Sequence, residues 1–377
     1  MKTNQLKLDI QGSKDKAKYY TAFSYLNIRP LFKAKLLEYF DFDIQRAWLC
    51  DENDLKAFCE IEEITIPKSF LSQKAKLDVD ECFKKAFLDE EVKLLTIEDE
   101  KYPPLLKEIP DYPISLYYKG DLNNISYDYN LAVVGSRNAT TNAKLSLNKI
   151  LSEFKNANIT IVSGLAYGID AQAHKSAIEN NIKTIGVIGC GLDIIYPSQN
   201  KFLYEQIKQG AGVIFSEYPL KTRPMAQNFP QRNRIVVGMS KGTLVAEAQM
   251  KSGAMISANL TLDYNRELMC MPGNLMNPNT EGIYHLIKQG AGIVVQAQDV
   301  LAQLNWEIIT PKAQDEYKTD LNETQKTVLD IISLEAKSFD EIINFANMEV
   351  SQLMISLTEL EIKGLIIQQN NKYYKCI

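Results

Sequence analysis

The chain has 377 residues, of which 45% are hydrophobic and 24% charged, and its net charge is −5. This length exceeds what one compact core usually holds, so we expect two or three domains. The sequence has no run of about 18 apolar residues that would predict a membrane span, and its polar N-terminus lacks the apolar stretch of a secretory signal. We therefore expect a cytoplasmic globular protein with no membrane partner.

The six cysteines are scattered, and no two of them form a C-x-x-C pair. Because the chain also has only two histidines, we expect no metal site. The cysteines are interpreted as reduced residues that pack in the interior.

The net charge conceals an uneven distribution along the chain. Residues 131–300 hold 16 Lys and Arg against 11 Asp and Glu, whereas the rest of the chain holds 26 against 36. A basic middle between acidic ends indicates a polyanionic partner. Since the excess is small, the motifs must carry the argument.

Short helices are predicted from residue 18 to about 95, because apolar residues recur there at three- and four-residue spacing. We assign residues 1–95 to an N-terminal helical domain. The next stretch, TIEDEKYPPLLKEIPDYPISLYYKGDL, contains four prolines and predicts an extended connector, in which ISLYYKG forms a short strand.

From residue 131 the pattern alternates between strands and helices, which predicts a doubly wound, mainly parallel sheet of the extended Rossmann-like α/β class over residues 96–305. The expected strands are Leu131–Val134, Thr160–Ser163, Thr184–Ile188, Val213–Ser216, Thr243–Ala246, Glu267–Met271 and Gly292–Val295. The expected helices include Thr141–Asn156, Ile169–Asn180, Lys201–Lys208, Met255–Asn265 and Ile283–Lys288.

A polar linker is expected over residues 306–319, and a small domain over residues 320–377 closes the chain. Three helical segments and a hairpin around Asn370–Asn371 predict a winged helix. This domain has more acidic than basic residues, and its expected recognition helix carries Glu359 and Glu361. Because phosphate repels an acidic helix, we predict that the domain contacts protein.

Ligands of open parallel sheets bind at the carboxyl ends of the strands, and here these ends run into loops of small and polar residues. The loops are GSR, SGLAYGID, GCGLD, SEYP, AEAQMKSG and PGN, and they place Ser163 and Gly164 at one strand end. Glycines admit a ligand to backbone N–H groups, and helix N-termini favour phosphate. The alternative is that these residues only form turns.

Known nucleotide motifs are absent. Gly189 and Gly191 begin a G-x-G-x-x-G pattern, but Ile194 occupies its third glycine position, and no Walker A loop occurs. Asp170 and His174 are four residues apart on an expected helix face, where they and Ser163 would form an acid–base and nucleophile set. We prefer the alternative that Asp170 supports the glycine loop and His174 packs beside it, because no further partner is evident.

Basic residues are better placed for chemistry than acidic ones. They lie in or near the loops at the strand ends, and Phe229 accompanies two of them; they are Arg137, Lys175, Arg232, Arg234 and Lys251. Arginine holds phosphate with forked donors, and an aromatic ring stacks an unpaired base. The segment NFPQRNRIVVG is interpreted as the beginning of a helix whose apolar side packs on the sheet while both arginines face the groove.

The loops, in this order, resemble the DNA-processing protein A (DprA/Smf) family. The resemblance is close over residues 95–300 and rests on LAVVGSRNAT, IVSGLAYGIDAQAHKSAIE, TIGVIGCGLDIIYPSQN, SEYP, NFPQRNRIVVGMSKGTLVAEAQMKSGAMISA, PGN and GIYHLIKQGA. The N-terminal domain, of the family's SAM/helix-hairpin-helix-like type, and the winged helix match in pattern.

The resemblance implies a non-enzymatic, cofactor-free homodimer that binds single-stranded DNA in natural transformation, protects it and helps to load the RecA recombinase. It also implies the DNA-binding residues Gly135, Ser136, Arg137, Phe229, Arg232, Asn233, Arg234, Lys251, Ser252 and Gly253. From their place in or near the strand-end loops, we expect Ser163, Gly164 and Lys175 to bind DNA as well. Two other hypotheses remain, a nucleotide (phosphoribo)hydrolase on the same sheet edge and an assembly module whose basic edge docks an acidic protein or the acidic tail of this chain.

Overall fold

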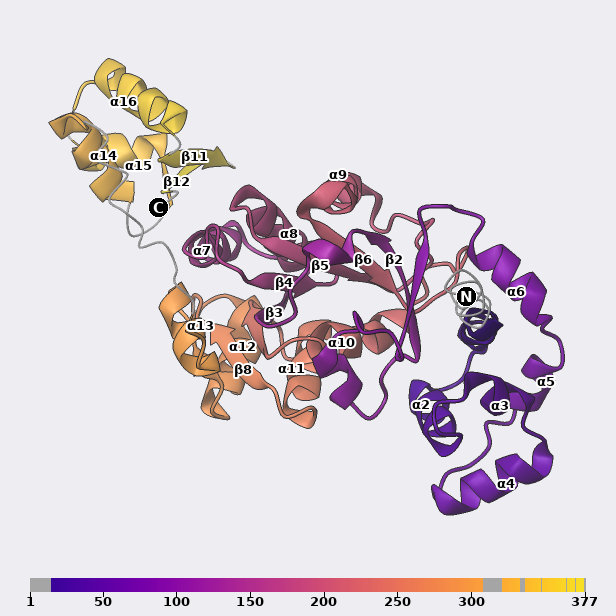
Figure 1. Cartoon of the computed structure of the whole chain (residues 1–377). Coiled ribbons are helices and arrows are strands. Elements are labelled where there is room, and N and C mark those ends of the chain that lie inside the picture. Colours follow the sequence, from indigo (N-terminus) through magenta and orange to yellow (C-terminus); the bar gives the residue numbers. More distant parts are fainter. Residues whose placement is uncertain are drawn as a thin grey trace. The chain divides into compact units, whose positions relative to one another are not determined.

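The computed structural model of the chain describes residues 15–307, 321–332, 336–346, 348–363, 365–369 and 371–375. The chain divides into two compact units, residues 1–310 and residues 311–377 (Figure 1). The predicted fold class is confirmed: a mainly parallel sheet with helices on both faces, preceded by short helices, forms the first unit, and a winged helix forms the second.

The N-terminal part is a set of short helices around an aromatic core. Residues 15–24 are helical. Side chains of Asp43, Asp51 and Asp78 accept hydrogen bonds from N–H groups in the first turns of three of the helices that follow, which fixes where these short helices begin. The helices are α2 (Pro30–Tyr39), α3 (Ile44–Leu49), α4 (Glu52–Ile61), α5 (Phe70–Lys74) and α6 (Val79–Ala86).

The helical prediction is wrong after residue 86. The chain leaves α6 at Ala86 and forms the strand β1 (Lys93–Thr96), which pairs antiparallel with β2 (Ser115–Gly120). Between α6 and β1 the carboxylate of Asp89 accepts a hydrogen bond from the backbone N–H of Glu91, and this turn ends the helical part of the chain. The predicted strand ISLYYKG is confirmed as β2.

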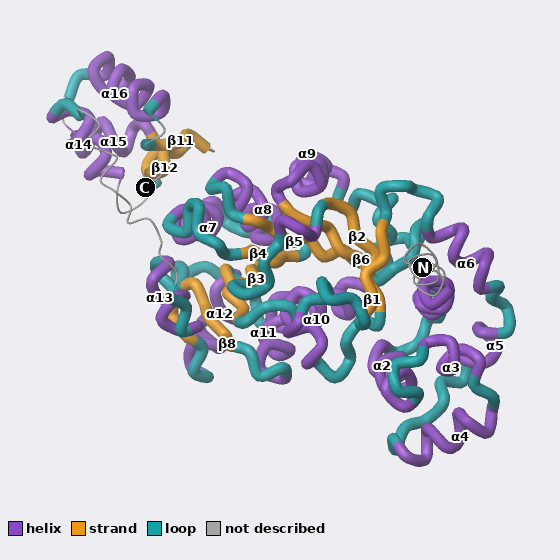
Figure 2. The backbone as a smooth tube through the Cα atoms, viewed as in Figure 1, coloured by secondary structure: helices purple, strands orange, loops and turns teal. Residues whose placement is uncertain are grey.

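The sheet has the strand order β1-β2-β6-β5-β4-β3-β7-β8-β9. Its parallel strands follow the predicted positions and are β3 (Asn130–Gly135), β4 (Thr160–Ser163), β5 (Lys183–Ile188), β6 (Gly212–Ser216), β7 (Gly242–Ala246), β8 (Glu267–Met271) and β9 (Gly292–Ile293). Residues of the central strands are buried because helices cover both faces (Figure 2). The first strand of the parallel series, β3, lies in the middle, so the chain winds outward from it in both directions.

Two layers of helices enclose the sheet. On one face α7 (Thr141–Ser152), α8 (Ile169–Glu179), α13 (Ala297–Leu304) and α9 (Lys201–Gln206) pack with the strands. On the other face lie α10 (Asn228–Gly238), α11 (Gly253–Asp263) and α12 (Glu281–Lys288), whose core continues into the N-terminal helices. The N-terminal helices are thus built onto the α10 side of the sheet (Figure 1).

The second unit has its own small core. It contains α14 (Glu323–Ile332), α15 (Phe339–Ala346) and α16 (Val350–Ile362), with a sheet of β10 (Lys337–Ser338), β12 (Lys372–Lys375) and β11 (Ile366–Gln369). The predicted three helices and hairpin are confirmed, and β10 is an addition. Asn371 adopts a left-handed conformation in the hairpin turn, as its residue type favours.

Candidate nucleic-acid interface

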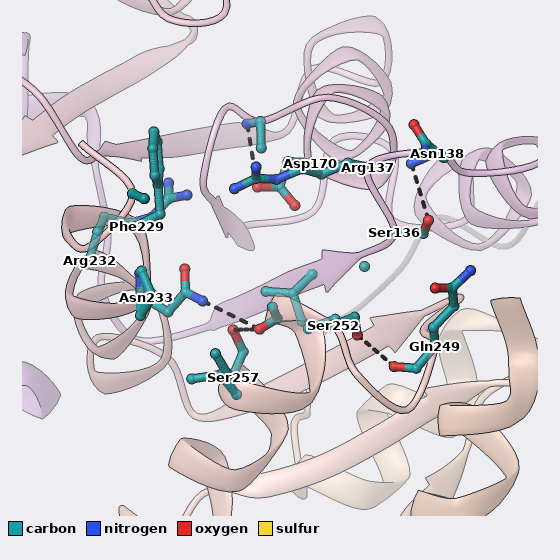
Figure 3. Close-up of a pocket in the computed structure, with 18 of the residues that line it drawn as sticks. Ser136, Arg137, Asn138, Asp170, Phe229, Arg232, Asn233, Gln249, Ser252 and Ser257 are labelled. Carbon is teal, nitrogen blue, oxygen red and sulfur yellow. Dashed lines mark hydrogen bonds between the residues drawn. The ribbon is translucent and has the colours of Figure 1, made fainter. Parts of the chain in front are cut away.

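A pocket of about 610 Å³ opens at the carboxyl ends of β3 and β7. This is the switch point of the sheet, where the chain's strand order reverses on either side of β3, and where open α/β sheets bind ligands. Its walls are the loop after β3, the start of α8, the first turns of α10 and the start of α11 (Figure 3). We call it the strand-end pocket. The prediction that loops from separate strands converge at this edge agrees with this geometry.

Backbone contacts fix the loop after β3. Ser136 donates its backbone N–H to the carbonyl of Glu247 at 2.8 Å, and its hydroxyl accepts the N–H of Asn138 at 3.1 Å. Gly168 has a φ of 75°, and a Cβ there would lie 2.1 Å from the carbonyl oxygen of Ser136. Only glycine therefore lets α8 begin so close to this loop.

An aromatic and a cationic side chain stack at the pocket. The guanidinium of Arg137 lies 5.3 Å from the ring centroid of Phe229. The ring of Tyr196 lies 5.5 Å from that of Phe229, tilted by 37°. Arg137 is exposed, and Tyr196 and Phe229 are only partly covered, so flat surfaces and a fixed positive charge face the same open space. The sequence reasoning missed Tyr196, although an aromatic residue in the loop after β5 was a signal for it.

Arg232 forms part of the floor of the pocket rather than projecting into it. Its side chain is only 4% exposed, and its Nη1 donates to the carbonyl oxygens of Gly164 and Val187, at the ends of β4 and β5. A Cβ at position 164 would lie 2.2 Å from that nitrogen, so glycine makes room for the guanidinium. The expectation that Arg232 faces the groove is thus only partly right: it lines the pocket while tying two strand ends together.

Arg234 does not face the pocket, and that part of the prediction is wrong. Its side chain is 3% exposed and its Nη2 pairs with a carboxylate oxygen of Glu217 at 2.5 Å, while Nε lies 3.7 Å from Asp111. Arg232 and Arg234 are two residues apart, which is about 200° around a helix. One guanidinium therefore reaches the ends of β4 and β5 in the floor of the pocket, and the other reaches Glu217 after β6 and Asp111 before β2.

Asp170 and His174 have the supporting roles that we preferred. Asp170 accepts the backbone N–H of Ala166 at 3.4 Å; burial raises its pKa, and the charge of Arg232 opposes this. Both ring nitrogens of His174 are engaged, one with Thr184 at 2.8 Å and one with the N–H of Leu165 at 3.3 Å. Burial lowers the pKa of His174 to about 3, so the ring is neutral.

Ser163 is fully buried and donates its hydroxyl to the carbonyl of Val133 at 2.7 Å. Its hydroxyl is therefore directed at Val133, while the ring nitrogens of His174 contact Thr184 and the N–H of Leu165. These residues therefore do not form the nucleophile–base pair of the hydrolase hypothesis. Among the described residues, no group of three or more His, Cys, Asp or Glu side chains is placed to hold a metal.

The start of α11 closes the pocket. Ser252 and Gly253 line it, and the amide of Asn233 on α10 donates to the carbonyl of Gly253 at 3.4 Å, which joins the two helices (Figure 3). The partial positive charge of a helix N-terminus favours an anion here. Lys251 is exposed just before α11.

Lys175 is not brought to this site. It lines a separate cavity between α8 and α9, and its Nζ lies 3.7 Å from Glu179 one turn later. Position 175 comes in the second turn of α8, which points away from the strand ends, so proximity in sequence to the SGLAYGID loop was misleading.

None of the described helices is long and apolar enough to cross a membrane.

Comparison with known proteins identifies the family. Residues 93–305 match the family model described as DNA recombination-mediator protein A, and residues 310–372 match the DprA winged helix domain. The protein Smf of Synechocystis is 34% identical over 316 residues, covering 74% of this chain and 79% of that protein. The DNA processing protein DprA of Streptococcus pneumoniae is 41% identical over 211 residues, which cover 56% of this chain and 74% of that protein.

Solved structures agree with this assignment. The X-ray structure of DNA processing protein A from Streptococcus pneumoniae has a TM-score of 0.65 and 34% identity, over 76% of this chain and 97% of that one. A structure of DNA processing protein A from Helicobacter pylori, described for its single-stranded DNA binding mode, has a TM-score of 0.51 and 30% identity, over 56% of this chain and 96% of that one. This chain belongs to the DNA recombination-mediator protein A (DprA/Smf) family.

Proposed function

We propose that this protein binds single-stranded DNA in the strand-end pocket, without catalysing a reaction on it. The observation that carries the proposal is the Arg137–Phe229–Tyr196 stack at the switch point of the sheet. A stacked ring pair accepts a base of any identity, and an exposed guanidinium accepts its phosphate. The single-stranded DNA binding named for the Helicobacter pylori relative supports the same assignment.

Each predicted residue has a distinct part in this proposal. Arg137 and Lys251 bind phosphates, together with N–H groups of the α11 start at Ser252 and Gly253. Gly135 and Ser136 form the loop that presents Arg137 to the strand, and the backbone N–H of Ser136 holds that loop to Glu247. Phe229 stacks a base, and Asn233 holds α10 against α11. Arg232 adds positive potential from beneath the pocket and keeps its floor in place. Ser163 and Gly164 support that floor, whereas Lys175 and Arg234 are left out of the contact surface.

A fluorescence anisotropy titration with labelled oligo-dT across a salt series tests the proposal. Because a single strand releases about 0.7 counterion per neutralised phosphate, Arg137→Ala should flatten the plot of log K against log salt by about 0.7. Lys149→Ala, which changes a lysine on α7 outside the pocket, is the matched control. Wild-type affinity and salt slope in Arg137→Ala would show that the site is elsewhere.

We further propose that the protein acts in the cytoplasm as a homodimer in natural transformation, where it protects incoming single strands and helps RecA to load onto them. Membership of a DNA recombination-mediator family supports this role. RecA ATPase activity on oligo-dT coated with single-strand-binding protein should rise when this protein is added. Sedimentation equilibrium measures the dimer. An unchanged RecA ATPase activity would contradict the loading role and leave the proposed DNA binding intact.

For the winged helix we propose a contact with protein. Its helix α16 exposes Met354, Ile355 and Ile362 and also Glu361, and exposed apolar and acidic side chains suit protein better than phosphate. Glu361→Gln should leave oligo-dT affinity unchanged. A higher affinity for oligo-dT after removal of residues 311–377 would instead indicate that the acidic unit masks the basic pocket.

A further inference from the structure

A second cavity, of about 450 Å³, lies between the N-terminal helices and the loop that joins β6 to α10. One wall is formed by residues 24–33, which include the start of α2, and the other by residues 217–222. We call it the N-terminal cleft. The first turn of α10 separates it from the strand-end pocket: Phe229 and Pro230 line the pocket, whereas Asn228 and Gln231 line the cleft. The two cavities are therefore neighbours across one helical turn.

The charge of the cleft favours an anion. Its charged lining residues are Lys33, Lys221 and Glu217. The carboxylate of Glu217 is bound to Arg234 at 2.5 Å, so its charge is already compensated. Lys221 is exposed, and its backbone N–H is held by the carboxylate of Asp193 at 2.9 and 3.1 Å. In the lining of the cleft, two lysines therefore stand against one carboxylate, which Arg234 already pairs.

Lys33 is a half-buried cation with donors to spare. Its ammonium donates to the carbonyl of Phe23 at 2.9 Å, and an ammonium carries three donors. Burial lowers the pKa of Lys33 to about 8, against the opposing effect of Glu217, so the group is mostly charged at neutral pH. A phosphate in the cleft would offset the loss of hydration that lowers the pKa of this ammonium.

The cleft also has surfaces for a base. Tyr25 and Tyr218 are partly exposed aromatic side chains on opposite walls, and the hydroxyl of Tyr218 donates to the side-chain oxygen of Gln231 at 3.1 Å. Asn27 adds an exposed amide at the rim. Aromatic faces, amides and lysines together are what non-sequence-specific binding of an unpaired nucleotide uses.

The walls of the cleft are held in place. The hydroxyl of Ser24 is hydrogen-bonded to that of Tyr117 on β2 at 2.7 Å, which ties the N-terminal wall to the sheet. On the opposite side the amide of Asn228 donates to the carbonyl of Gly189 at 3.0 Å. A ligand would thus enter a preformed site, with little ordering cost.

We propose that the N-terminal cleft is a second nucleotide-binding site for the same DNA strand that occupies the strand-end pocket. The strand crosses the first turn of α10, where Arg223 is exposed on the preceding loop, and places a phosphate between Lys33 and Lys221. The inference rests on the proposed function. Its consequence is that oligonucleotides long enough to reach both cavities bind more tightly than short ones.

The test compares oligo-dT of about six and about twenty nucleotides, lengths that bracket the usual footprint of a single-strand site. Lys221→Ala and Lys33→Met should each weaken the long oligonucleotide by roughly three- to tenfold and flatten its salt slope by about 0.7. Both variants should leave the short oligonucleotide unchanged. Lys241→Ala, at an exposed lysine before β7 on the opposite edge of the sheet, is the control.

Two results would overturn the inference: equal losses for both lengths, or no loss for the long one. The Lys221 variant decides the matter if Lys33→Met fails to fold, because Lys221 is exposed on a loop. Arg137→Ala distinguishes the two proposals. If it affects neither length, the proposed function fails; if it weakens both while the lysine variants change nothing, only the cleft is refuted.

Discussion

Replacing Arg234 should cost stability and leave DNA binding intact, although the residue lies two positions from one that lines the pocket. Arg234→Met removes the cation from a pair in which the arginine side chain is 3% and the Glu217 side chain 15% exposed. Breaking a buried pair on one side leaves a charge without its partner, which costs about 3–5 kcal/mol. Little of this is screened by solvent, because both groups are well covered.

The double variant Arg234→Met/Glu217→Leu separates this cause from a loss of packing. Nε and Nη1 of Arg234 have no hydrogen-bond partner although they are buried, so the native pair is imperfectly satisfied. An apolar replacement of both residues should therefore recover most of the lost free energy of unfolding. Asp111 is 28% exposed and stays partly hydrated when the arginine is gone.

Urea unfolding followed by circular dichroism measures the stability of the single and double variants, and anisotropy with oligo-dT at a temperature where both are folded measures binding. Arg234→Met should bind oligo-dT within about twofold of wild type, because Arg234 does not line the strand-end pocket. A twofold change in affinity corresponds to only about 0.4 kcal/mol of binding free energy. The reasoning would be refuted by the opposite pattern, in which stability is unchanged and affinity falls tenfold.

Three further predictions follow from the pocket. Gly164→Ala should displace the guanidinium of Arg232 and lower the free energy of unfolding in urea by about 2 kcal/mol or more, because hydrogen bonds of a charged group are lost. Gly253→Ala is the control and should be neutral, because a Cβ there meets nothing within 4 Å. Equal losses of stability in the two variants would exclude the steric cause. Phe229→Ala should weaken oligo-dT binding by about 1–3 kcal/mol in anisotropy, whereas Phe229→Tyr, which keeps an aromatic ring, should bind as wild type does. Wild-type affinity in Phe229→Ala would show that no base stacks on this ring. Because the folded-state pKa of His174 is about 3 against 6.5, its stabilisation is complete above pH 6.5 and falls with pH below it, by about 2–3 kcal/mol between pH 7.5 and 4.5; His174→Gln should lose this part of the pH dependence, and parallel curves would contradict the assignment.

The sheet was predictable because its strands are short, continuous apolar runs, each followed by a loop of small residues. Every residue of β4 and β7 is buried, including Val162 and Val245, so these strands are covered on both faces and their sequences are apolar almost throughout. The strand β1 was missed because Lys93–Thr96 is covered on one side only and alternates weakly after an acidic turn. A short edge strand gains its identity from the neighbour it pairs with, here β2, and not from its own residues.

The direction of side chains within the site was harder to predict than the location of the site. The segment NFPQRNRIVVG is helical throughout, as Asn228–Gly238. With 3.6 residues per turn, residues two apart lie on opposite sides, so Arg232 and Arg234 could not share a face. The helical period was therefore sufficient to reject a shared groove, but it could not say which arginine faces the strand ends, because that depends on where the helix packs.

Burial of both arginines gives α10 its role in the site. Arg232 is anchored to the carbonyls of β4 and β5, and Arg234 to a carboxylate beyond β6 and one before β2. Two charged anchors on opposite sides of one helix restrict its rotation and sliding, since either movement would leave a buried charge unpaired. The first turn of α10 carries Phe229 into the strand-end pocket and Asn228 into the wall of the N-terminal cleft. Fixing that turn therefore fixes the relative position of both surfaces. Arg232 keeps its contacts with the carbonyls of Gly164 and Val187 when Arg234 is replaced, which is why we expect Arg234→Met to lose stability but not DNA affinity.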